Sequence, residues 1–507
     1  MSEANGQELP PGWKAAHLGD VLEVIRGVTY RKEESRKNPE EGFVPVLRAN
    51  NIQGTLVFDD LVYVPAKDVS EIQKLRADDI VVAASSGSRA IVGKAAQLKH
   101  SWHGSFGAFC FGLRPEAYIE HRFLGWFLHT KEYRNRVSNA SAGVNINNLR
   151  AEHIEQTPFR VPPFEEQVRI ADALDELLSD LDAGGAGMER VLAKLAQYRA
   201  AVLKAAVEGA LTADWRKKHR KVEPAAALLT RVLAERRRRW EEDQLRKFKE
   251  AGKEPPKNWR GKYREPVAPD TTNLPLLPDG WCWASGEQLF CWSSGEGLSV
   301  RQATEGAYPV YGGNGVNGQH HEFVCGFPTL VIGRVGEHCG NAYTTSGPAW
   351  VTDNAIYATF VPESVELSFL QFCFTRARLR SRSAGSGQPF VNQTMLNITV
   401  LPLAPRAEQE VIIGEVEDQF SVIEHLEADL AAKLKSAQAL RQSILRHAFT
   451  GQLVLQDPKD EPAAELLKRI AAEREERARQ ILAARRVIAK AKSSRKKRVR
   501  TVRTSLN

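Results

Sequence analysis

The chain has 507 residues, 42% hydrophobic and 26% charged, with a formal net charge of +8, a composition typical of a soluble protein with several domains. No apolar run approaches the roughly 18 residues that a membrane span needs, and the first residues hold no apolar leader, which excludes a membrane-spanning protein and indicates the cytoplasm. The six cysteines form no CxxC pair and have no histidines at zinc-site spacing, so we expect reduced, packed thiols and no metal site.

Residues 1–163 are predicted to form a first globular domain that is mostly β-structured. Short apolar runs at 44–47, 61–64 and 80–83 are bounded by Gly, Asn, Ser and Asp residues, as strands usually are. Aromatic and leucine residues recur at helical spacing over 119–137, which predicts one helix there.

Small polar residues with Arg, Asn and Lys follow two of these strands. Arginine pairs well with guanine edges and asparagine with adenine edges, while serine and lysine commonly contact phosphates, so these residues could form a nucleic-acid surface. Ordinary turn chemistry is the alternative explanation for each of them. The candidates in this domain are Arg48, Asn50, Asn51, Ser86, Ser88, Arg89 and Lys94.

Residues 164–212 are predicted to form one long helix that needs a partner helix. Apolar side chains recur with the alternating spacing of four and three residues that is typical of a coiled coil, and only Gly184 interrupts the series. The series consists of Ile170, Leu174, Leu177, Leu181, Met188, Val191, Leu195, Tyr198 and Val202.

The partner helix is predicted in the same chain, because a second copy of this region lies 242 residues further on. We therefore expect a second globular domain at 276–403 and a second long helix at 404–453, packed antiparallel to the first. Repeated residues include Pro163 and Pro405, Glu166-Gln167 and Glu408-Gln409, Gly209 and Gly451, and, with a shifted offset, Gly12-Trp13 and Gly280-Trp281.

Two further segments are strongly basic. The first lies within an insertion and linker at 213–275, where residues 213–264 hold 18 Lys and Arg against 8 Asp and Glu. A solvated charged helix explains it as well as a surface that touches DNA backbone or an acidic partner. The second is the tail 485–503, with 10 Lys and Arg and no acid, which is expected to be disordered.

Prolines mark where the helices of these segments begin and end. Pro224 is expected to open a helix in the insertion, and Pro255-Pro256 to close it. Pro462 is expected to open another helix within the C-terminal segment 454–507.

The second domain has few charges and many glycine and aromatic residues. Its stretch 311–318 is too rich in glycine for a strand interior and is predicted to be a loop. Residues 331–336 are predicted to form a strand that ends at an arginine beside glycines, and 352–355 lead into another strand. The candidates for nucleic-acid contact here are Tyr311, Asn314, Asn317, Arg334 and Asn354.

A polar domain followed by Val161-Pro162-Pro163-x-x-Glu166-Gln167 at the start of a long helix, repeated as Leu403-Ala404-Pro405-x-x-Glu408-Gln409, resembles the specificity subunit of Type I restriction-modification enzymes. In the second domain, residues 308–315, 332–336 and 352–355 are similar to that family's target recognition domains, and 44–52 and 78–82 carry the match in the first. The resemblance covers nearly the whole chain except the basic insertion and the tail.

The resemblance and the repeat together imply an α+β fold. We expect two globular mixed α/β, β-rich target recognition domains separated by two long antiparallel coiled-coil helices, with an internal pseudo-two-fold repeat. Each domain is expected to read one half of a bipartite sequence in double-stranded DNA, and the helices to set the spacer between the halves.

The resemblance also implies partners and cofactors. The helices are expected to dock two methyltransferase subunits, and restriction and translocase subunits can join them. S-adenosylmethionine, ATP and magnesium are expected in those partner subunits, with no cofactor in this chain.

The sequence gives no sign of catalysis by this chain. Val161-Pro162-Pro163-Phe164 has the Pro-Pro-Phe of an adenine-methyltransferase motif but valine where an asparagine is needed, and no Walker A or glycine-rich cofactor loop is found. Two alternatives stay open: a fused methyltransferase or nuclease with an unrecognised site, and a coiled-coil organiser or decoy without sequence preference.

Overall fold

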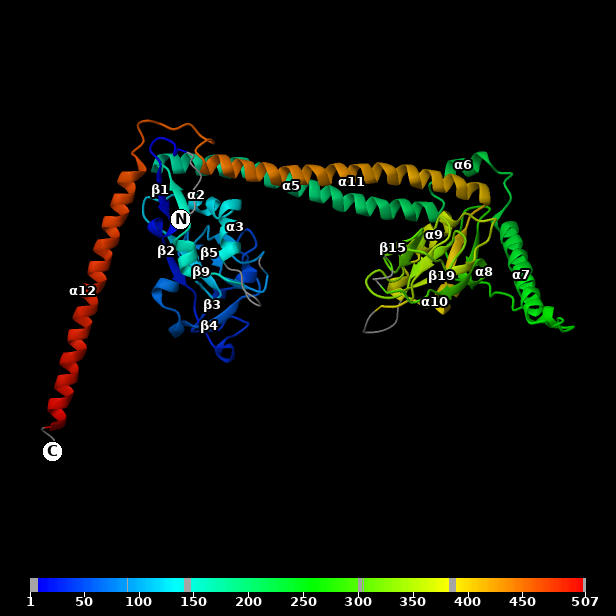
Figure 1. Ribbon diagram of the computed structural model, residues 1–507, viewed down its shortest axis with the longest axis horizontal. Coiled ribbons are helices and arrows are strands. Elements are labelled where there is room, and N and C mark those ends of the chain that lie inside the picture. The colour runs from blue at the N-terminus through cyan, green and yellow to red at the C-terminus, as the bar shows by residue number, and fades with distance from the viewer. Residues whose placement is uncertain are drawn as a thin grey trace. The chain divides into compact units, whose positions relative to one another are not determined.

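The computed structural model describes residues 8–88, 90–140, 147–299, 303, 305–382 and 389–504, with side chains up to residue 483. The chain forms two compact units (Figure 1). Unit 1 comprises residues 1–188 and 432–507, and unit 2 comprises 189–431. Every helix in the described part is too short or too polar to cross a lipid bilayer.

The globular domain of unit 1 is built on two small sheets. The antiparallel four-stranded sheet has the order β2-β9-β5-β7, and the three-stranded sheet has the order β4-β3-β8, with β3 and β8 parallel. The strands are β2 (Leu22–Arg26), β9 (Cys110–Pro115), β5 (Ile80–Ala83), β7 (Ala95–Gln97), β4 (Val62–Pro65), β3 (Phe43–Leu47) and β8 (Ser105–Phe106). The strands predicted from the apolar runs are confirmed, because these β-branched side chains are buried between the sheets and the surrounding helices.

Two further strand pairs and short helices complete this domain. Thr130 divides the single helix predicted over 119–137 into α2 and α3, since its hydroxyl donates to Phe127 O (2.7 Å) and accepts from Tyr133 N (3.3 Å). The elements are β1 (Lys14–His17) with β11 (Pro158–Val161), β6 (Ser85–Ser86) with β10 (Asn147–Asn148), α1 (Leu18–Val21), α2 (His121–Phe127), α3 (Lys131–Ala140), α4 (Ala151–Glu155) and the 3-10 helices η1 (Lys32–Glu34), η2 (Ala49–Asn51), η3 (Ala66–Asp68) and η4 (Glu71–Gln73).

The domain of unit 2 repeats this topology with a different sequence. Its sheets have the orders β13-β19-β16-β17 and β15-β14-β18, and β12 pairs with β20 as β1 pairs with β11. The elements are β12 (Cys282–Ser285), α8 (Gly286–Leu289), β13 (Cys291–Ser294), β14 (Tyr308–Gly312), β15 (Gly315–His320), β16 (Leu330–Gly333), β17 (Ala342–Thr344), β18 (Trp350–Val351), β19 (Ala355–Phe360), α9 (Leu367–Arg376), η6 (Leu379–Arg382), α10 (Gln393–Asn397) and β20 (Val400–Leu403).

The glycine-rich stretch 311–318 is a β-hairpin, so the prediction of a loop there is wrong. β14 and β15 pair antiparallel with a register shift between Val310 and Tyr311. The turn between the two strands is formed by Gly313 and Asn314, and the glycines within the strands lie where neighbouring groups approach the backbone closely. The strand predicted to end at Arg334 is confirmed as β16.

The two long helices, α5 (Phe164–Val207) and α11 (Arg406–Phe449), have 44 residues each. In unit 1 the first part of α5 lies beside the last part of α11, where Arg441 pairs with Asp182. In unit 2 the last part of α5 lies beside the first part of α11, where Tyr198 Oη donates to Gln419 Oε1 at 3.0 Å. Early residues of one helix thus meet late residues of the other, which is the predicted antiparallel pairing.

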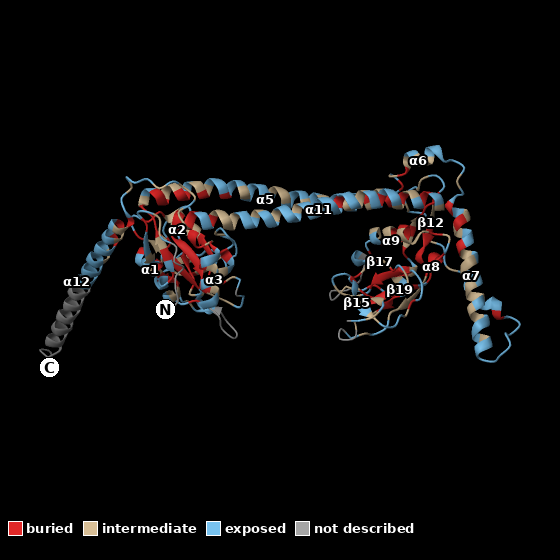
Figure 2. Ribbon diagram, turned by 45° about the horizontal axis from the view of Figure 1, so that its top comes forward, coloured by how far each residue is buried: buried red, intermediate tan, exposed pale blue. Residues whose placement is uncertain are grey.

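The burial of the helices differs from the predicted coiled-coil series. Their ends are buried where they pack on the domains, whereas their middle stretches are largely exposed (Figure 2). Leu178, outside the predicted series, is fully buried, but the predicted Leu177, Val191 and Tyr198 are 42%, 44% and 51% exposed. Near the domain, the buried residues recur with the 3.6-residue period of a straight helix rather than the 3.5-residue period of a coiled coil. Further along, each helix has only the other as a neighbour, so only a narrow stripe of it is covered.

A buried glutamate joins the start of each long helix to the tryptophan that precedes its domain. In unit 1, Trp13 Nε1 donates to Glu166 Oε2 (3.0 Å), and Gln456 Nε2 donates both to Glu166 Oε1 (3.2 Å) and to Gly451 O (2.7 Å). Burial raises the pKa of Glu166, and the hydrogen bonds from Gln456 and Trp13 oppose the shift.

In unit 2 the equivalent glutamate has a charged partner. Trp281 Nε1 donates to Glu408 Oε2 (2.9 Å), and Arg216 forms an ion pair with Glu408 while donating to Gly209 O (2.6 Å). Thr212 Oγ1 donates to the same carboxylate at 2.5 Å. Gln456 in unit 1 and Arg216 in unit 2 therefore have the same structural position, one neutral and one cationic.

The glutamine after each glutamate connects the helix to its own domain. Gln167 accepts from Glu120 N (2.9 Å) and donates to Pro162 O (2.9 Å). Gln409 accepts from Glu366 N (2.8 Å) and donates to Ala404 O (2.7 Å). Because each amide group is buried and bonded on both sides, it fixes the direction in which the long helix leaves the domain.

The segment after each long helix forms a further helix: α7 (Ala225–Glu250) packs on the domain of unit 2, and α12 (Ala463–Thr504) packs on the domain of unit 1. The insertion also contains α6 (Ala213–Lys218) and η5 (Trp259–Lys262). The C-terminal segment contains α12, so the tail that was expected to be disordered continues this helix. Arg474 and Arg477 of α12 pair with Glu116, and although burial raises the pKa of Glu116, these two arginines lower it below its usual value.

We expect Glu408→Gln to destabilise unit 2 by about 3 kcal/mol, because it leaves the guanidinium of Arg216 largely buried without its counter-charge. Glu166→Gln is the matched control and should cost less, about 1–2 kcal/mol, since it leaves one neutral N–H donor of Trp13 or Gln456 without an acceptor but no buried charge without a partner. Hydrogen exchange of peptides from each unit in increasing urea measures both losses separately. Equal losses in the two variants would contradict this account.

Candidate nucleic-acid interface

Three of the asparagines predicted from the sequence of the second domain line one groove in unit 2. Asn314 and Asn317 come from the β14–β15 hairpin, and Asn354 from the turn between β18 and β19. All three side chains are exposed, and the groove has a volume of about 450 Å³. The sheet topology therefore brings together residues that lie 40 positions apart in the sequence.

Glycines permit the close packing that shapes this groove. A Cβ atom at Gly312 would lie 2.2 Å from Asn317 Nδ2, which is closer than any real contact. The hairpin strand can therefore pass directly beneath the Asn317 amide only with glycine at this position.

The groove offers neutral polar groups. An asparagine amide can both donate and accept hydrogen bonds, and this is the pattern that matches the major-groove edge of adenine. The hydroxyl of Thr352, which also lines the groove, is buried and has no hydrogen-bond partner among the described residues. A buried hydroxyl without a partner indicates a place where a ligand or water completes the bonding.

Arg334 and Tyr311 lie beside the groove in different roles. Arg334 is exposed at the end of β16, and its Nη1 donates weakly to Asp353 O at 3.5 Å. Tyr311 is only 9% exposed, packs in the core and donates its Oη to Thr344 O (3.2 Å), so its side chain supports the sheet rather than facing a ligand.

The corresponding turn in unit 1 lies between β8 and β9. Gly107 N donates to Leu47 O at the end of β3 (2.9 Å), and Ala84 N at the end of β5 donates to Phe109 O (2.8 Å). These bonds place the tip of the turn next to the ends of two strands from different sheets.

The turn in unit 2 has the same hydrogen bonds. Thr352 N donates to Tyr311 O at the end of β14, and Arg334 N at the end of β16 donates to Asn354 O, both at 2.9 Å. Phe109 in the first domain therefore occupies the position of Asn354 in the second.

Phe109 was missed by the sequence-based predictions. Its side chain is 69% exposed, more than that of any other phenylalanine among the described residues. Phenylalanine contacts the methyl group of thymine or stacks on bases where it meets DNA. The only signal in the sequence was an aromatic residue between glycine and a strand, which is too common to identify it.

The predicted residues after β3 are held largely by the loop that follows them, residues 57–60. Arg48 Nη2 donates to Asp60 Oδ2 (2.7 Å), and the exposed Asn50 donates to the same atom (3.2 Å). Asn51 is 1% exposed and bonds to Arg48 N, Val57 O and Asp59 O. Asn51 thus closes the loop and cannot reach a ligand, whereas Arg48 and Asn50 lie at the surface.

The other predicted residues of the first domain lie around the end of β5. Ser86 is half-buried in β6 and its hydroxyl accepts from Ser88 N (3.2 Å), while Ser88 and Lys94 are exposed. Phe109 O accepts from Ser85 N (3.2 Å), which brings the exposed Phe109 to the same edge. Arg89 lies outside the described residues.

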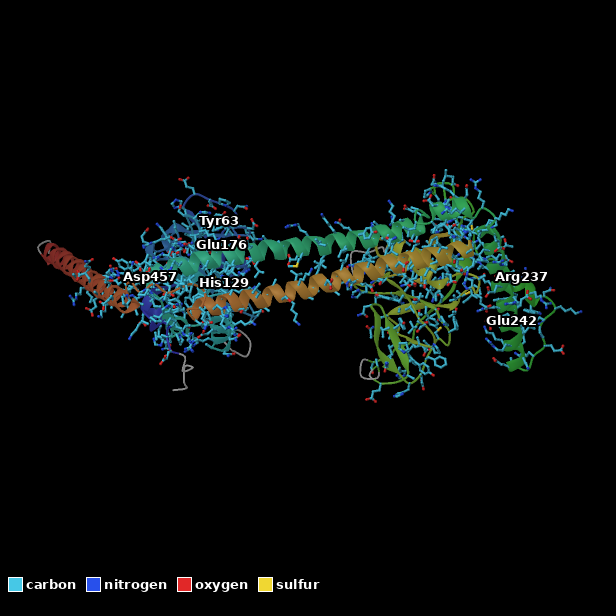
Figure 3. The ribbon with its side chains drawn as sticks, turned by 90° about the horizontal axis from the view of Figure 1, so that it is seen from above. Tyr63, His129, Glu176, Arg237, Glu242 and Asp457 are labelled. Carbon is cyan, nitrogen blue, oxygen red and sulfur yellow. The ribbon has the colours of Figure 1, made fainter. Side chains whose placement is uncertain are left out.

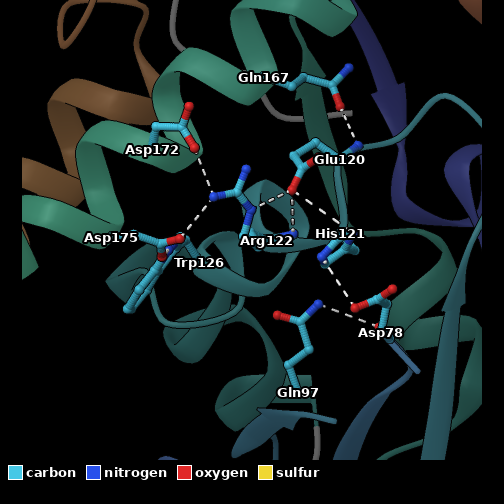
Figure 4. A network of polar contacts seen from close by, with 9 residues as sticks. All are labelled: Asp78, Gln97, Glu120, His121, Arg122, Trp126, Gln167, Asp172 and Asp175. Carbon is cyan, nitrogen blue, oxygen red and sulfur yellow. Dashed lines mark hydrogen bonds and ion pairs between the residues drawn. The ribbon is translucent and has the colours of Figure 1, made fainter. Parts of the chain in front are cut away.

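A polar network in unit 1 binds α2 to α5 (Figure 4). Arg122 contacts Glu120 (2.7 Å), Asp172 (2.8 Å) and Asp175 (3.1 Å), and Trp126 Nε1 donates to Asp175 Oδ1 (2.8 Å). The network lies along a cavity of about 930 Å³ between the domain and the long helices. Its charged groups are paired within the protein, so it acts as a brace rather than as a reactive centre.

One histidine of this cavity is held neutral. Burial lowers the pKa of His129 to about 4, assisted by Arg441 and Arg134. Among the described residues, no three His, Cys, Asp or Glu side chains are grouped so that they could hold a metal ion.

Comparison with known proteins identifies the family. Residues 10–185 match the Type I restriction modification DNA specificity domain. The chain is 32% identical to the EcoKI specificity subunit of Escherichia coli K12, over 92% of this chain and 96% of that one. It is 30% identical to the StySPI specificity subunit of Salmonella potsdam, over 93% and 97%.

A solved structure supports the fold. A chain from a study of complex assembly and conformational transition of the type I R-M system aligns with a TM-score of 0.57 and 14% identity, covering 88% of this chain and all of that one. Near-complete coverage of two relatives at 30% identity or more, together with a shared fold, leaves one assignment: the chain belongs to the family of Type I restriction enzyme specificity subunits.

Proposed function

We propose that this chain selects the DNA sequence on which a Type I restriction-modification complex acts, with each globular domain reading one half of a split target. The observation that carries the proposal is the pair of equivalent turns, which have the same backbone hydrogen bonds but present Phe109 in one domain and Asn354 in the other. A shared frame with different exposed side chains suits two domains that read different bases.

The reading surface in the second domain is the groove lined by Asn314, Asn317 and Asn354, with Arg334 beside it. In the first domain it is the edge formed by Phe109, Ser88 and Lys94. Arg48 and Asn50 add to it from the segment that directly follows β3. Arginine and lysine would position the duplex through its phosphates, and the asparagines and Phe109 would contact base edges.

The long helices would set the spacer and dock the partner subunits. At 1.5 Å per residue, 44 residues of helix extend about 66 Å. Docked subunits would cover the exposed apolar side chains along both helices. They are Leu177, Val191, Tyr198, Val422, Leu426 and Leu440.

In this proposal the chain is not itself a catalyst. Two methyltransferase subunits would bind S-adenosylmethionine and modify adenine, and restriction and translocase subunits would use ATP and magnesium. The chain's own contribution is to bind DNA and to hold the partners in register with the two half-sites.

The test is to express the chain together with its methyltransferase partner and to map modified adenines in genomic DNA by long-read sequencing. We expect a motif of two short defined halves around a fixed gap. A single continuous motif would mean that only one domain reads DNA, and an absence of sequence preference would favour an organiser or decoy.

Substitution at the two equivalent turn positions should alter one half-site each. We expect Asn354→Ala to relax the base choice at a position in one half, and Phe109→Ala to do so in the other, each with a loss of about 1–3 kcal/mol in discrimination. The same mapping reads out both variants. If both changed the same half, the equivalence of the two domains as separate readers would be wrong.

Gly312→Ala should impair the second half-site without unfolding the domain. The new Cβ would collide with the flexible end of Asn317, 2.2 Å away, and displace that amide from the groove. Gly347→Ala is the control, because nothing lies within 4 Å of its Cβ position. Thermal unfolding should be nearly unchanged in both, and unaltered base choice in Gly312→Ala would argue against Asn317 as a reader.

Inserting four alanines between Gly184 and Gly185 should lengthen the spacer by one or two base pairs, since a helical turn adds about 6 Å and base pairs are spaced by about 3.4 Å. The same insertion between Lys253 and Glu254, in an exposed loop, should leave the motif unchanged. Altered half-sites with an unaltered gap would show that the helix is not the spacer.

A further inference from the structure

The far end of the insertion in unit 2 folds into a small body of its own, residues 236–264, which we call the basic lobe. Helix α7 ends at Glu250, before the prolines that were expected to close it, because Gly252 adopts a φ of +63° and turns the chain back. The returning segment carries η5, which places Trp259 against the helix.

An aromatic cluster makes this lobe rigid. Trp259 is 6% exposed and stacks on Trp240 with ring centroids 5.9 Å apart, and Phe248 meets it edge-on at 6.3 Å. Tyr263 packs on Trp240 at 5.3 Å. The basic residues of the lobe are therefore mounted on a folded surface, unlike those of a disordered charged run.

The lobe holds two kinds of cation. The arginines other than Arg264 are bound within the protein, mostly in ion pairs such as Arg237 with Glu241 (3.3 Å) and Arg238 with Glu242 (3.7 Å), and Figure 3 shows Arg237 and Glu242 on α7. The others are exposed, and among the described residues no acid lies within ion-pair distance of them. They are Lys247, Lys249, Lys253, Lys257, Lys262 and Arg264.

These unpaired cations distinguish the lobe from an ordinary solvated helix. A solvated charged helix neutralises itself with nearby acids, as the arginines of α7 do. Six cations without such partners on one small folded body attract a polyanion, and the compactness of the lobe lowers the entropy lost when they bind it. Double-stranded DNA carries one negative charge per about 1.7 Å of its axis, which suits closely placed lysines.

The lobe is fixed to the domain but lies apart from the reading groove. Arg236 Nη1 donates to Phe290 O (2.6 Å), and Arg239 pairs with Glu363 (2.6 Å), which anchors α7 to the domain. Figures 1 and 2 both place α7 beside α8, on the side of the domain away from β15. The lobe is therefore accessible only to duplex that extends outside the groove.

We propose that the basic lobe binds the phosphate backbone of the duplex outside the half-site read by the second domain. This rests on the proposed function, since it requires that the domain holds DNA. The lobe adds affinity without adding sequence information, because phosphates are the same at every position.

The experiment compares two quadruple variants of the full chain bound to its methyltransferase partner. The lobe variant carries Lys249→Gln, Lys253→Gln, Lys257→Gln and Lys262→Gln. The control variant carries Lys204→Gln, Lys218→Gln, Arg220→Gln and Lys221→Gln, four exposed cations of the same unit without ion pairs among the described residues. The net charge changes equally in both.

Binding is measured against potassium chloride concentration on three duplexes: one that ends at the edges of the mapped target, one extended by 20 base pairs on both sides, and one of the extended length without the target. We expect the lobe variant to flatten the salt dependence on the two long duplexes by up to about 3 to 4 units of slope, at about 0.9 per lost phosphate contact. On the short duplex its slope should match that of the unmodified chain.

Two results would overturn the proposal. An unchanged slope on the long duplexes would show that the lobe does not touch DNA, and weakened binding of the partner subunit at the same time would identify an acidic protein surface as its ligand. An equal effect in the control variant would show that overall charge is responsible. If the unmodified complex showed no preference for the target, the proposed function would be wrong instead. The salt slopes on the duplex without the target would still show whether the lobe binds DNA.

Discussion

The buried Glu-Gln pair at the start of each long helix is the interaction on which both halves depend. The glutamate accepts hydrogen bonds from the tryptophan that precedes the domain and from the residue that follows the opposite long helix, and the glutamine bonds to the domain itself. Because these polar groups are buried, leaving any of them unpaired would cost free energy of folding. In each unit they therefore hold together the tryptophan segment before the domain, the start of one long helix and the segment that follows the other. Unit 2 strengthens the same arrangement with the charge of Arg216, where unit 1 has neutral Gln456.

This anchoring allows the exposed turns to differ. The sheets of the two domains have the same order, and the turn between β8 and β9 in one domain has the same backbone hydrogen bonds as the turn between β18 and β19 in the other. Side chains at the tip, Phe109 or Asn354, therefore change without altering the frame that presents them. Glycines at close approaches, such as Gly312, complete the frame by leaving room for the side chains of the groove.

The exposed middle of the long helices has a related cause. Two helices that pair without further cover bury only a stripe of each, so Val191, Tyr198 and Leu426 stay at the surface although their spacing is that of a coiled-coil seam. Spacing shows which residues share a face of a helix, but the number of neighbouring elements decides how much of that face is buried. The same reasoning explains why Leu178, which faces the domain, is buried and Leu177 is not.

The sequence alone determined the duplication, the two long helices, several strands and the family, because repeats, periodicity and local motifs are properties of neighbouring residues. It also placed Asn314, Asn317, Asn354 and Arg334 on segments that the fold brings together. Only the tertiary structure decided that Asn51 and Tyr311 are buried, and that Phe109 stands where Asn354 stands. Those facts depend on hydrogen bonds and packing between strands that are distant in the chain, and no local pattern of residue types records which strands become neighbours.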